Sequence, residues 1–307
     1  DLVVFGGGPL MGLGVLAEMQ AIFEVAKASQ VRTLIAGCGV GPLGQDWHNR
    51  SIRRILELAD LRIYRDESSR QLAAKIGVES NNDAVAEDPA FSWLAAQREA
   101  LPAERNHERP VLLLGLRDFP YKAYARHLDK RACRVAKSNY EQAVLDAFSM
   151  LVSSNPDLVI KPLPMCTNHF GHDDRWFYRR LFRARKELDA RLDASLLGVE
   201  LAPLEYCAEF RKADVALVMR FHSLVFALGL DLPAVAIDYT LGRGKVRALA
   251  DRFNVPQQSL DVLSAEFLAR ELQRLLDNPE PQAPGFEPGF PNMIKSGIPV
   301  LLEGHAA

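Results

Sequence analysis

The stretch MRFHSLVFAL, residues 219–228, places one arginine and one histidine between two apolar runs. The run ALVM (216–219) is typical of a buried strand, and SLVFALGL (223–230) is typical of a buried helix. Arg220 and His222 are therefore predicted at the turn where the carboxyl end of a strand meets the amino end of a helix. In an open α/β sheet, ligands bind at such turns.

The same order of strand, turn and helix recurs along the chain. Short apolar runs alternate with longer segments of helical periodicity, which favours parallel sheets covered by helices. A polar and charged stretch at 96–110 reads as a linker between two halves. Expected strands lie at 2–5, 33–37, 61–65, 111–117, 157–164, 214–219 and 234–238, and expected helices lie near 15–29, 47–58, 67–76, 138–153, 174–190, 203–212, 222–230 and 264–277.

This organisation predicts an α/β fold with two Rossmann-like domains and a cleft between them. We expect an N-terminal domain at 1–98, a C-terminal domain at 110–278, and a tail at 279–307 that packs across the surface or back onto the first domain. The chain has no initial Met and opens inside an expected strand, DLVVFGGG. We therefore expect an N-terminal part to be missing from the first domain.

The composition limits the classes of function. The chain has 307 residues, of which 48% are hydrophobic and 25% charged, and its formal net charge is −2. Without a field of positive charge, we expect no nucleic-acid partner. No apolar run reaches the roughly 18–20 residues of a membrane helix, so membrane association is expected to be peripheral at most. The four cysteines lack CxxC spacing, which argues against a disulfide framework or zinc site and fits a cytoplasmic location.

Two glycine-rich turns, FGGGPLMGLG (5–14) and AGCGVGPLG (36–44), each follow an expected strand and precede an expected helix. Glycine lets backbone NH groups approach a phosphate or a sugar closely. Neither turn has the spacing of a nucleotide-binding motif. The turns indicate either a ligand-facing loop, with Gly6, Gly7 and Gly8 as candidates, or tight packing alone.

Cationic side chains recur at the predicted carboxyl ends of strands. Arg65 in YRDESSR and Arg117 in LGLRDF each follow an apolar strand, as Arg220 does. A guanidinium there can bind a carboxylate or a phosphate, although a surface ion pair is the favoured alternative for Arg65. Lys245 in DYTLGRGKV adds a further positive charge. His222 adds a group that can exchange protons near neutral pH. The set favours a small ligand with several negative charges.

The segment NHFGHDD (168–174) contains His169, His172 and two aspartates. A metal site is conceivable, because imidazole and carboxylate are good ligands. Capping of the next helix by the aspartates is favoured instead, so no metal site is predicted. The helix RWFYRRLFRARK (175–186) could touch an anionic membrane surface, and a solvated face is the favoured alternative.

The segment MRFHSLVFALGLDLPAVAIDY followed by GKV resembles the C-terminal signature of the polysaccharide pyruvyl transferase family, roughly RxHxxxFAxxxxxPxxxIxYxxK. The GGG turn, GCGVGPLG, the Arg-Asp of YRDESS and DPAF occur in the family's order, so the resemblance spans roughly 2–250. Two features depart from the family. TLGRG between Tyr239 and Lys245 is longer than the usual Asp-Pro link, and the usual opening unit with its Asn-x-Gly-Asp turn is absent.

The resemblance implies a GT-B-type fold with a central cleft, the N-terminal domain binding the acceptor and the C-terminal domain the donor. It implies transfer of pyruvyl from phosphoenolpyruvate to sugar hydroxyls as a ketal, without a cofactor or a metal. Arg65, His222 and Lys245 match the family's functional residues. Expected partners are phosphoenolpyruvate and a saccharide acceptor, which a lipid could carry. The full set of expected substrate-binding residues is Arg220, Arg117, Ser223, Gly6, Gly7 and Gly8.

Two other functions stay open. A GT-B glycosyltransferase that uses a nucleotide-sugar would need a carboxylate to bind the ribose, and Glu205 in PLEY is the candidate. A sugar-binding or scaffold protein without activity is the third possibility. In every case we expect the protein in the cytoplasm, with at most a peripheral association at the inner face of the membrane.

Overall fold

The computed structural model describes residues 2–79, 83–101, 109–125, 127–167, 173–242 and 244–303. The chain divides into two compact units, which are described one at a time. The first unit comprises residues 1–93 together with 287–307, and the second comprises residues 94–286. The C-terminal segment therefore belongs to the same unit as the N-terminus.

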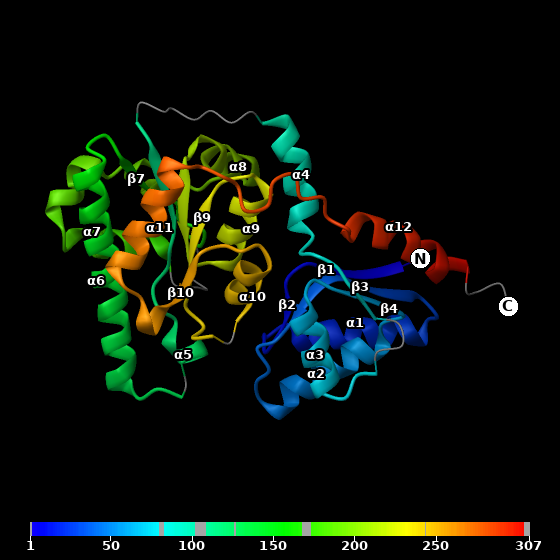
Figure 1. Cartoon of the computed structure of the whole chain (residues 1–307). Helices are drawn as coiled ribbons and strands as arrows, with labels where there is room; N and C mark the ends of the chain where they lie inside the picture. Colours follow the sequence, from blue (N-terminus) through cyan, green and yellow to red (C-terminus); the bar gives the residue numbers. More distant parts are fainter. Residues whose placement is uncertain are drawn as a thin grey trace. The chain divides into compact units, whose positions relative to one another are not determined.

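The first unit contains a five-stranded parallel sheet in the order β1-β3-β4-β5, with β2 paired to the end of β3. Consecutive parallel strands need a crossover, which helices supply here. Figure 1 shows the sheet and its helices. The strands are β1 (Leu2–Gly6), β2 (Pro9–Leu10), β3 (Arg32–Val40), β4 (Leu61–Tyr64) and β5 (Asp83–Val85), and the crossover helices are α1 (Leu16–Ala28), α2 (Asp46–Leu58) and α3 (Glu67–Lys75).

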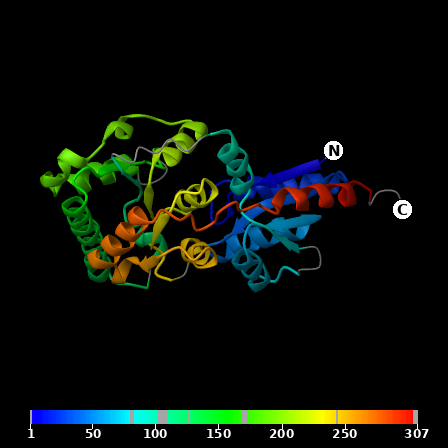
Figure 2. The same ribbon diagram turned by 45° about the horizontal axis from the view of Figure 1, so that its top comes forward.

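Strand β3 is buried on both faces because its side chains alternate between two cores. Ile35 and Cys38 pack with residues of α1, α2 and α3. Leu34 and Ala36 pack on the other face against apolar residues of α12 (Phe290–Glu303). Helix α12 lies along this sheet in both ribbon views (Figures 1 and 2). The C-terminal helix thus completes the core of the first unit.

Gly37 interrupts the regular pairing of β3. The register between β3 and β4 shifts between Ala36 and Cys38, as a bulge does. Gly37 has φ +66°, and a Cβ there would come 2.2 Å from the Pro89 side chain and 3.0 Å from that of Phe290. Only glycine fits this close approach. The first half of the glycine-rich stretch 36–44 is therefore explained by packing.

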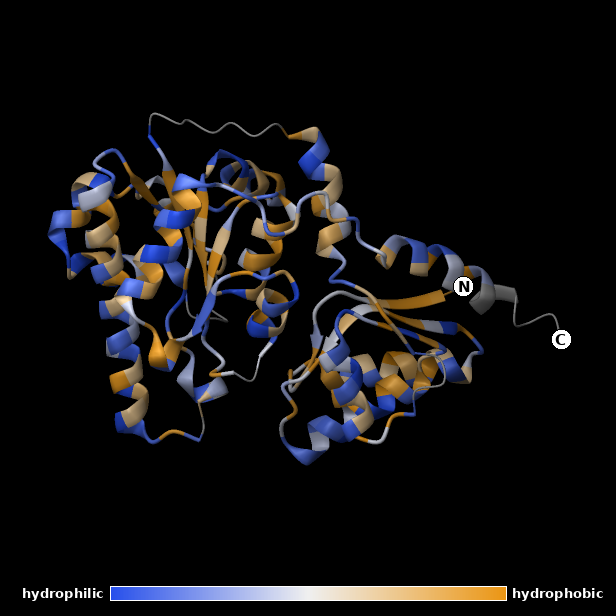
Figure 3. Ribbon diagram, viewed as in Figure 1, coloured by the Kyte–Doolittle hydropathy of each residue, from blue (hydrophilic) through white to orange (hydrophobic). Residues whose placement is uncertain are grey.

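The second unit contains a five-stranded parallel sheet in the order β10-β9-β8-β6-β7. Figure 3 shows how hydrophobic its central strands are. Taken in chain order the strands run 2-1-3-4-5, so the winding direction reverses between β6 and β8, the position where ligands bind in doubly wound folds. The strands are β6 (Val111–Gly115), β7 (Val159–Pro162), β8 (Val215–Val218), β9 (Ala234–Asp238) and β10 (Gln257–Ser259).

Helices connect these strands. The described ones are α4 (Ala90–Ala100), which contains the division between the units, α5 (Tyr121–Tyr124), α6 (Lys130–Ser154), α7 (Asp174–Arg183), α8 (Pro203–Lys212), α9 (Phe221–Gly229), α10 (Lys245–Arg252) and α11 (Ala265–Asp277), with 3-10 turns at Lys186–Arg191, Ser195–Gly198 and Leu260–Val262. None of the helices among the described residues is both long and apolar enough to cross a membrane.

Several boundaries differ from the sequence-based expectation. Helix α4 extends to Ala100, into the stretch expected as a linker from 96, and α6 begins at Lys130 rather than near 138. Residues 102–108 of that linker lie outside the described residues. Strands β5 and β10 and helices α10 and α12 were not expected. The two strands have three residues each, and α12 carries Gly297 and Pro299 inside a helix, which hides its periodicity.

Candidate functional site

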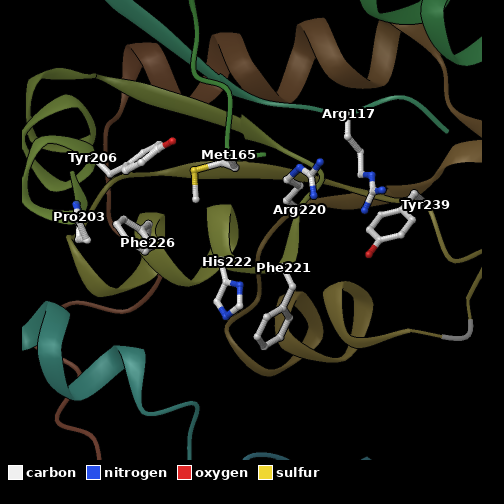
Figure 4. Close-up of a pocket in the computed structure, with 9 residues that line it drawn as sticks. All are labelled: Arg117, Met165, Pro203, Tyr206, Arg220, Phe221, His222, Phe226 and Tyr239. Atoms are coloured by element: carbon white, nitrogen blue, oxygen red, sulfur yellow. The ribbon is translucent and has the colours of Figure 1, made fainter. Parts of the chain in front are cut away.

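A pocket of about 430 Å³ lies within the second unit, at the carboxyl ends of its central strands. Arg117 follows β6, Arg220 follows β8 and Tyr239 follows β9. The pocket therefore sits at the point where the winding of the sheet reverses. Figure 4 shows its lining, which consists of Arg117, Met165, Pro203, Tyr206, Arg220, Phe221, His222, Phe226 and Tyr239.

The turn between β8 and α9 is fixed by the neighbouring strand. The backbone NH groups of Met219 and Arg220 donate to the Gly115 carbonyl at 3.0 and 3.3 Å. Arg220 has an extended backbone, with φ −81° and ψ 143°, and the helix begins at the next residue. The sequence-based prediction of a strand, a turn and a buried helix here is confirmed by the fold.

Asp174 holds the Arg220 side chain. The Arg220 Nε and Nη2 atoms donate to the two Asp174 carboxylate oxygens at 2.8 and 2.6 Å. The same carboxylate accepts from the backbone NH groups of Met165 and Cys166 at 3.1 and 3.0 Å. Asp174 is fully buried, so these four bonds supply what water would otherwise give. Sequence reasoning treated Asp174 as a helix cap and missed this contact.

Burial and ion pairing shift the pKa values of Asp174 and Arg220 in opposite directions. Burial raises the pKa of Asp174, although the hydrogen bonds and charge of Arg220 oppose that shift. Burial alone would lower the pKa of Arg220, but its hydrogen bonds and ion pair with Asp174 outweigh burial, so the pKa is raised. Arg220 therefore stays charged and is oriented by its partner.

Arg117 supplies the second cation of the pocket. Its guanidinium carbon lies 5.3 Å from the centre of the Tyr239 ring, a cation–π contact. Its backbone carbonyl accepts from the Tyr140 hydroxyl at 3.1 Å. Arg117 is partly buried, and its Nε atom has no hydrogen-bond partner among the described residues. A bound anion would satisfy this donor.

His222 is the second residue of α9 and is exposed. Its ring centre lies 5.4 Å from that of Phe221, nearly perpendicular to it. Phe226 follows four residues later, so both side chains lie on one face of the helix. Figure 4 shows Tyr206 and Phe226 to one side of His222, and Phe221, Arg220 and Arg117 to the other.

Ser223 and Lys245 do not line the pocket. Ser223 is fully buried against β6, since a Cβ on Gly115 would meet its Oγ at 2.5 Å. Lys245 begins α10, beyond a loop in which Asp238 accepts from the NH groups of Thr240 and Gly242 at 2.9 and 2.6 Å. Roles for Ser223 and Lys245 remain predictions.

The expected residues of the first unit lie at the carboxyl ends of its strands. Gly7 and Gly8 follow β1 with φ +68° and +58°, in a turn that favours glycine, and a Cβ at either would meet nothing within 4 Å. Arg65 follows β4 and is buried, and its Nη1 donates to Asp88 Oδ2 at 2.9 Å. Asp88 also accepts from the Ala90 NH at the start of α4. Arg65 thus forms a buried ion pair rather than a surface one.

Other candidates have local structural roles or lie outside the described part. Glu205 Oε2 accepts from the Ala202 NH at 2.6 Å and so caps its own helix, α8. Asp173 caps α7 by accepting from the Arg175 NH. His169 and His172 lie outside the described residues. Among the residues that the structure describes, no group of three or more His, Cys, Asp or Glu could hold a metal ion.

The two units and their parallel sheets define a class of protein, the GT-B-type fold with two Rossmann-like domains, and solved structures agree. A Listeria monocytogenes protein assigned as a UDP-N-acetylglucosamine 2-epimerase has a TM-score of 0.62 at 15% identity, over 99% of this chain and 74% of the other. Staphylococcus aureus MnaA, solved with UDP, has a TM-score of 0.59 at 13% identity, over 98% of this chain and 75% of the other. Anabaena HepE, solved with UDP, has a TM-score of 0.53 at 12% identity, over 92% of this chain and 70% of the other.

The family model described as polysaccharide pyruvyl transferase matches residues 1–240. The chain therefore belongs to the polysaccharide pyruvyl transferase family, as its signature around Arg220 and His222 predicts. Comparison with curated proteins gives no match.

Proposed function

We propose that the protein transfers the pyruvyl group of phosphoenolpyruvate to two hydroxyls of a saccharide, forming a pyruvate ketal and releasing phosphate. The observation that carries the proposal is the pocket at the strand-order reversal, where Arg220 and His222 of the family signature line one cavity together with Arg117. A three-carbon acid with a carboxylate and a phosphate matches that charge. The reaction is expected in the cytoplasm.

Arg117 and Arg220 contribute differently to anion binding. Asp174 neutralises much of the charge of Arg220 and fixes the direction of its remaining NH groups. Arg117 forms no hydrogen-bonded ion pair in the part of the chain that the structure describes, although its charge also acts on Asp174, and its Nε is unsatisfied there. We therefore assign the stronger attraction for the donor to Arg117 and the orienting contact to Arg220.

His222 is the proposed group that moves protons. Protonation of the vinyl carbon C3 makes C2 electrophilic, and a sugar hydroxyl loses its proton as its oxygen bonds to C2. A second hydroxyl then attacks C2, its proton leaves, the C2–O bond to phosphate breaks, and inorganic phosphate departs as the ketal closes. An imidazole can serve as acid or base in these steps. The exposure of His222 leaves it accessible to both substrates.

The residues matched by resemblance outside the pocket keep their proposed roles. Arg65 and Lys245 would neutralise the remaining charge of phosphoenolpyruvate, and Gly6, Gly7 and Gly8 would approach a substrate through backbone NH groups. For Arg65 this requires that a ligand share the guanidinium with Asp88. Ser223 is better explained by its packing against Gly115.

A glycosyltransferase that uses a nucleotide-sugar is the second candidate. It is supported by neighbours of the same fold that were solved with UDP. The carboxylate that it would need for the ribose is not supplied by Glu205, which caps α8. Pyruvyl transfer therefore agrees better with the described residues.

The test is release of inorganic phosphate from phosphoenolpyruvate in the presence of saccharide acceptors, together with calorimetric binding of phosphoenolpyruvate. Arg117→Ala should weaken donor binding about 10- to 100-fold, because it removes charged hydrogen bonds. Arg180→Ala is the control, since Arg180 pairs with Glu141 outside the pocket. Equal affinity in the Arg117→Ala protein would refute the donor site, and transfer from a UDP-sugar without phosphate release would favour the second candidate.

A further inference from the structure

The pocket has two chemically different ends (Figure 4). Arg117, Arg220 and Tyr239 form the cationic end. The volume of the whole pocket, about 430 Å³, lies in the range of sites that bind drug-sized ligands and exceeds what a three-carbon acid needs. The other end, here called the aromatic end, consists of Met165, Pro203, Tyr206 and Phe226, and Phe221 and His222 complete the lining.

Helix α9 arranges the pocket groups in a row. Arg220 precedes its first residue, His222 is its second, and Phe226 lies one turn further on the same face. A ligand that rests on Phe226 therefore has His222 beside it and the arginines beyond. The proton-transfer group thus lies between an apolar surface and an anion site. The proposed reaction needs this arrangement, because the proton moves where the acceptor and the donor meet.

The aromatic end is held rigidly. The Tyr206 and Phe226 ring centres lie 6.4 Å apart at 75°, and the Phe210 ring packs against Phe226 with ring centres 5.4 Å apart. The Tyr206 hydroxyl donates to the Pro164 carbonyl at 2.8 Å, which fixes its ring. None of the described residues that line this end carries a carboxylate or a carboxamide. Recognition here is by contact with apolar surface.

We propose that the aromatic end is the acceptor subsite and receives the apolar C–H face of a pyranose ring against Phe226 and Tyr206, with the reacting hydroxyls toward His222. This inference rests on the proposed function and names the part of the chain that binds its acceptor. It differs from the expectation that the N-terminal domain binds the acceptor, because the acceptor ring then lies beside the arginines of the second unit.

The experiment measures binding of a defined probe without turnover. Methyl β-D-glucopyranoside, whose ring hydrogens form apolar faces, is titrated into the protein and followed by saturation-transfer NMR, with and without phosphoenolpyruvate. Phe226→Leu and Tyr206→Leu keep apolar volume but remove an aromatic face, and each should weaken glycoside binding roughly three- to tenfold. Phe182→Leu is the matched control and should leave glycoside binding unchanged, since it removes a ring that stacks on Phe148 outside the pocket.

Parallel phosphate-release assays should show a raised KM for the glycoside and an unchanged KM for phosphoenolpyruvate in both variants. The subsite is overturned if the wild type does not bind the glycoside, if both variants bind it like the wild type, or if only the KM for phosphoenolpyruvate rises. It is also overturned if uridine binding, and not glycoside binding, is what the variants lose. Glycoside binding that depends on Phe226 without any phosphate release would support the subsite and refute pyruvyl transfer instead.

Discussion

At the scale of single residues, Asp174 sets the orientation of the charged end of the pocket. Its carboxylate joins three segments, the loop at Met165, the start of α7 and the end of β8. Asp174→Asn replaces one acceptor oxygen by an NH₂ donor that would face other donors. We expect a loss of about 3 kcal/mol in the free energy of unfolding, because a buried pair is broken.

Urea denaturation of the Asp174→Asn and Asp173→Asn proteins tests this. Asp173 caps the same helix and pairs with Arg175 nearer the surface, so its substitution should cost only about 1 kcal/mol. Equal losses in the two variants would mean that the Arg220 contact adds no stability.

His222 belongs to the same scale, and its prediction is kinetic. If it moves protons, His222→Gln should keep the fold and lose roughly 10²–10⁴-fold in turnover, because glutamine can hydrogen-bond but cannot transfer the proton. Phosphate release measures turnover, and circular dichroism controls for folding. A His222→Gln protein with near-normal turnover would return this side chain to a structural role at the start of α9.

At the scale of elements, α9 can approach β6 because Gly115 has no side chain. A Cβ there would lie 2.5 Å from Ser223 Oγ and 2.6 Å from Ser223 Cβ. Gly115→Ala should therefore push α9 away, lower the stability by about 1–3 kcal/mol and weaken donor binding, since Arg117 and Arg220 flank this contact. Thermal unfolding and calorimetry measure both effects.

Two further variants sharpen that test. Gly198→Ala should be nearly neutral, because nothing lies within 4 Å of the Cβ it adds. Combining Gly115→Ala with Ser223→Gly should recover part of the loss, because the second change removes the clashing atoms. If the two single losses of stability simply add in the double variant, residues other than Ser223 accommodate the added methyl group.

Elements were predictable from the sequence where periodicity was strong. The strand LVVF, the helix at 47–58 and the strand–turn–helix at 216–230 agree with β1, α2, β8 and α9. Helix α10 was missed because TLGRG before it reads as loop. The role of Asp174 could not be predicted, because its partner Arg220 lies 46 residues away and local spacing indicated only a cap.

At the scale of the whole molecule, the C-terminal segment belongs to the same unit as the N-terminus, and helix α12 covers one face of the first sheet. Met293, Ile294 and Ile298 pack against Leu34 and Ile63 there. Ile294→Asp places a charge against this core, and we expect the first unit to lose about 3 kcal/mol or more of stability while the second unit, which has its own core, stays folded.

Lys295→Asp is the matched control, because Lys295 is the exposed neighbour on the same helix and its change should be nearly neutral. Limited proteolysis combined with mass spectrometry distinguishes the units. Cleavage in the Ile294→Asp protein should concentrate between residues 2 and 93, and residues 109–286 should stay protected. Uniform cleavage of both units would mean that they unfold together, so that the C-terminal helix stabilises the second unit through the first.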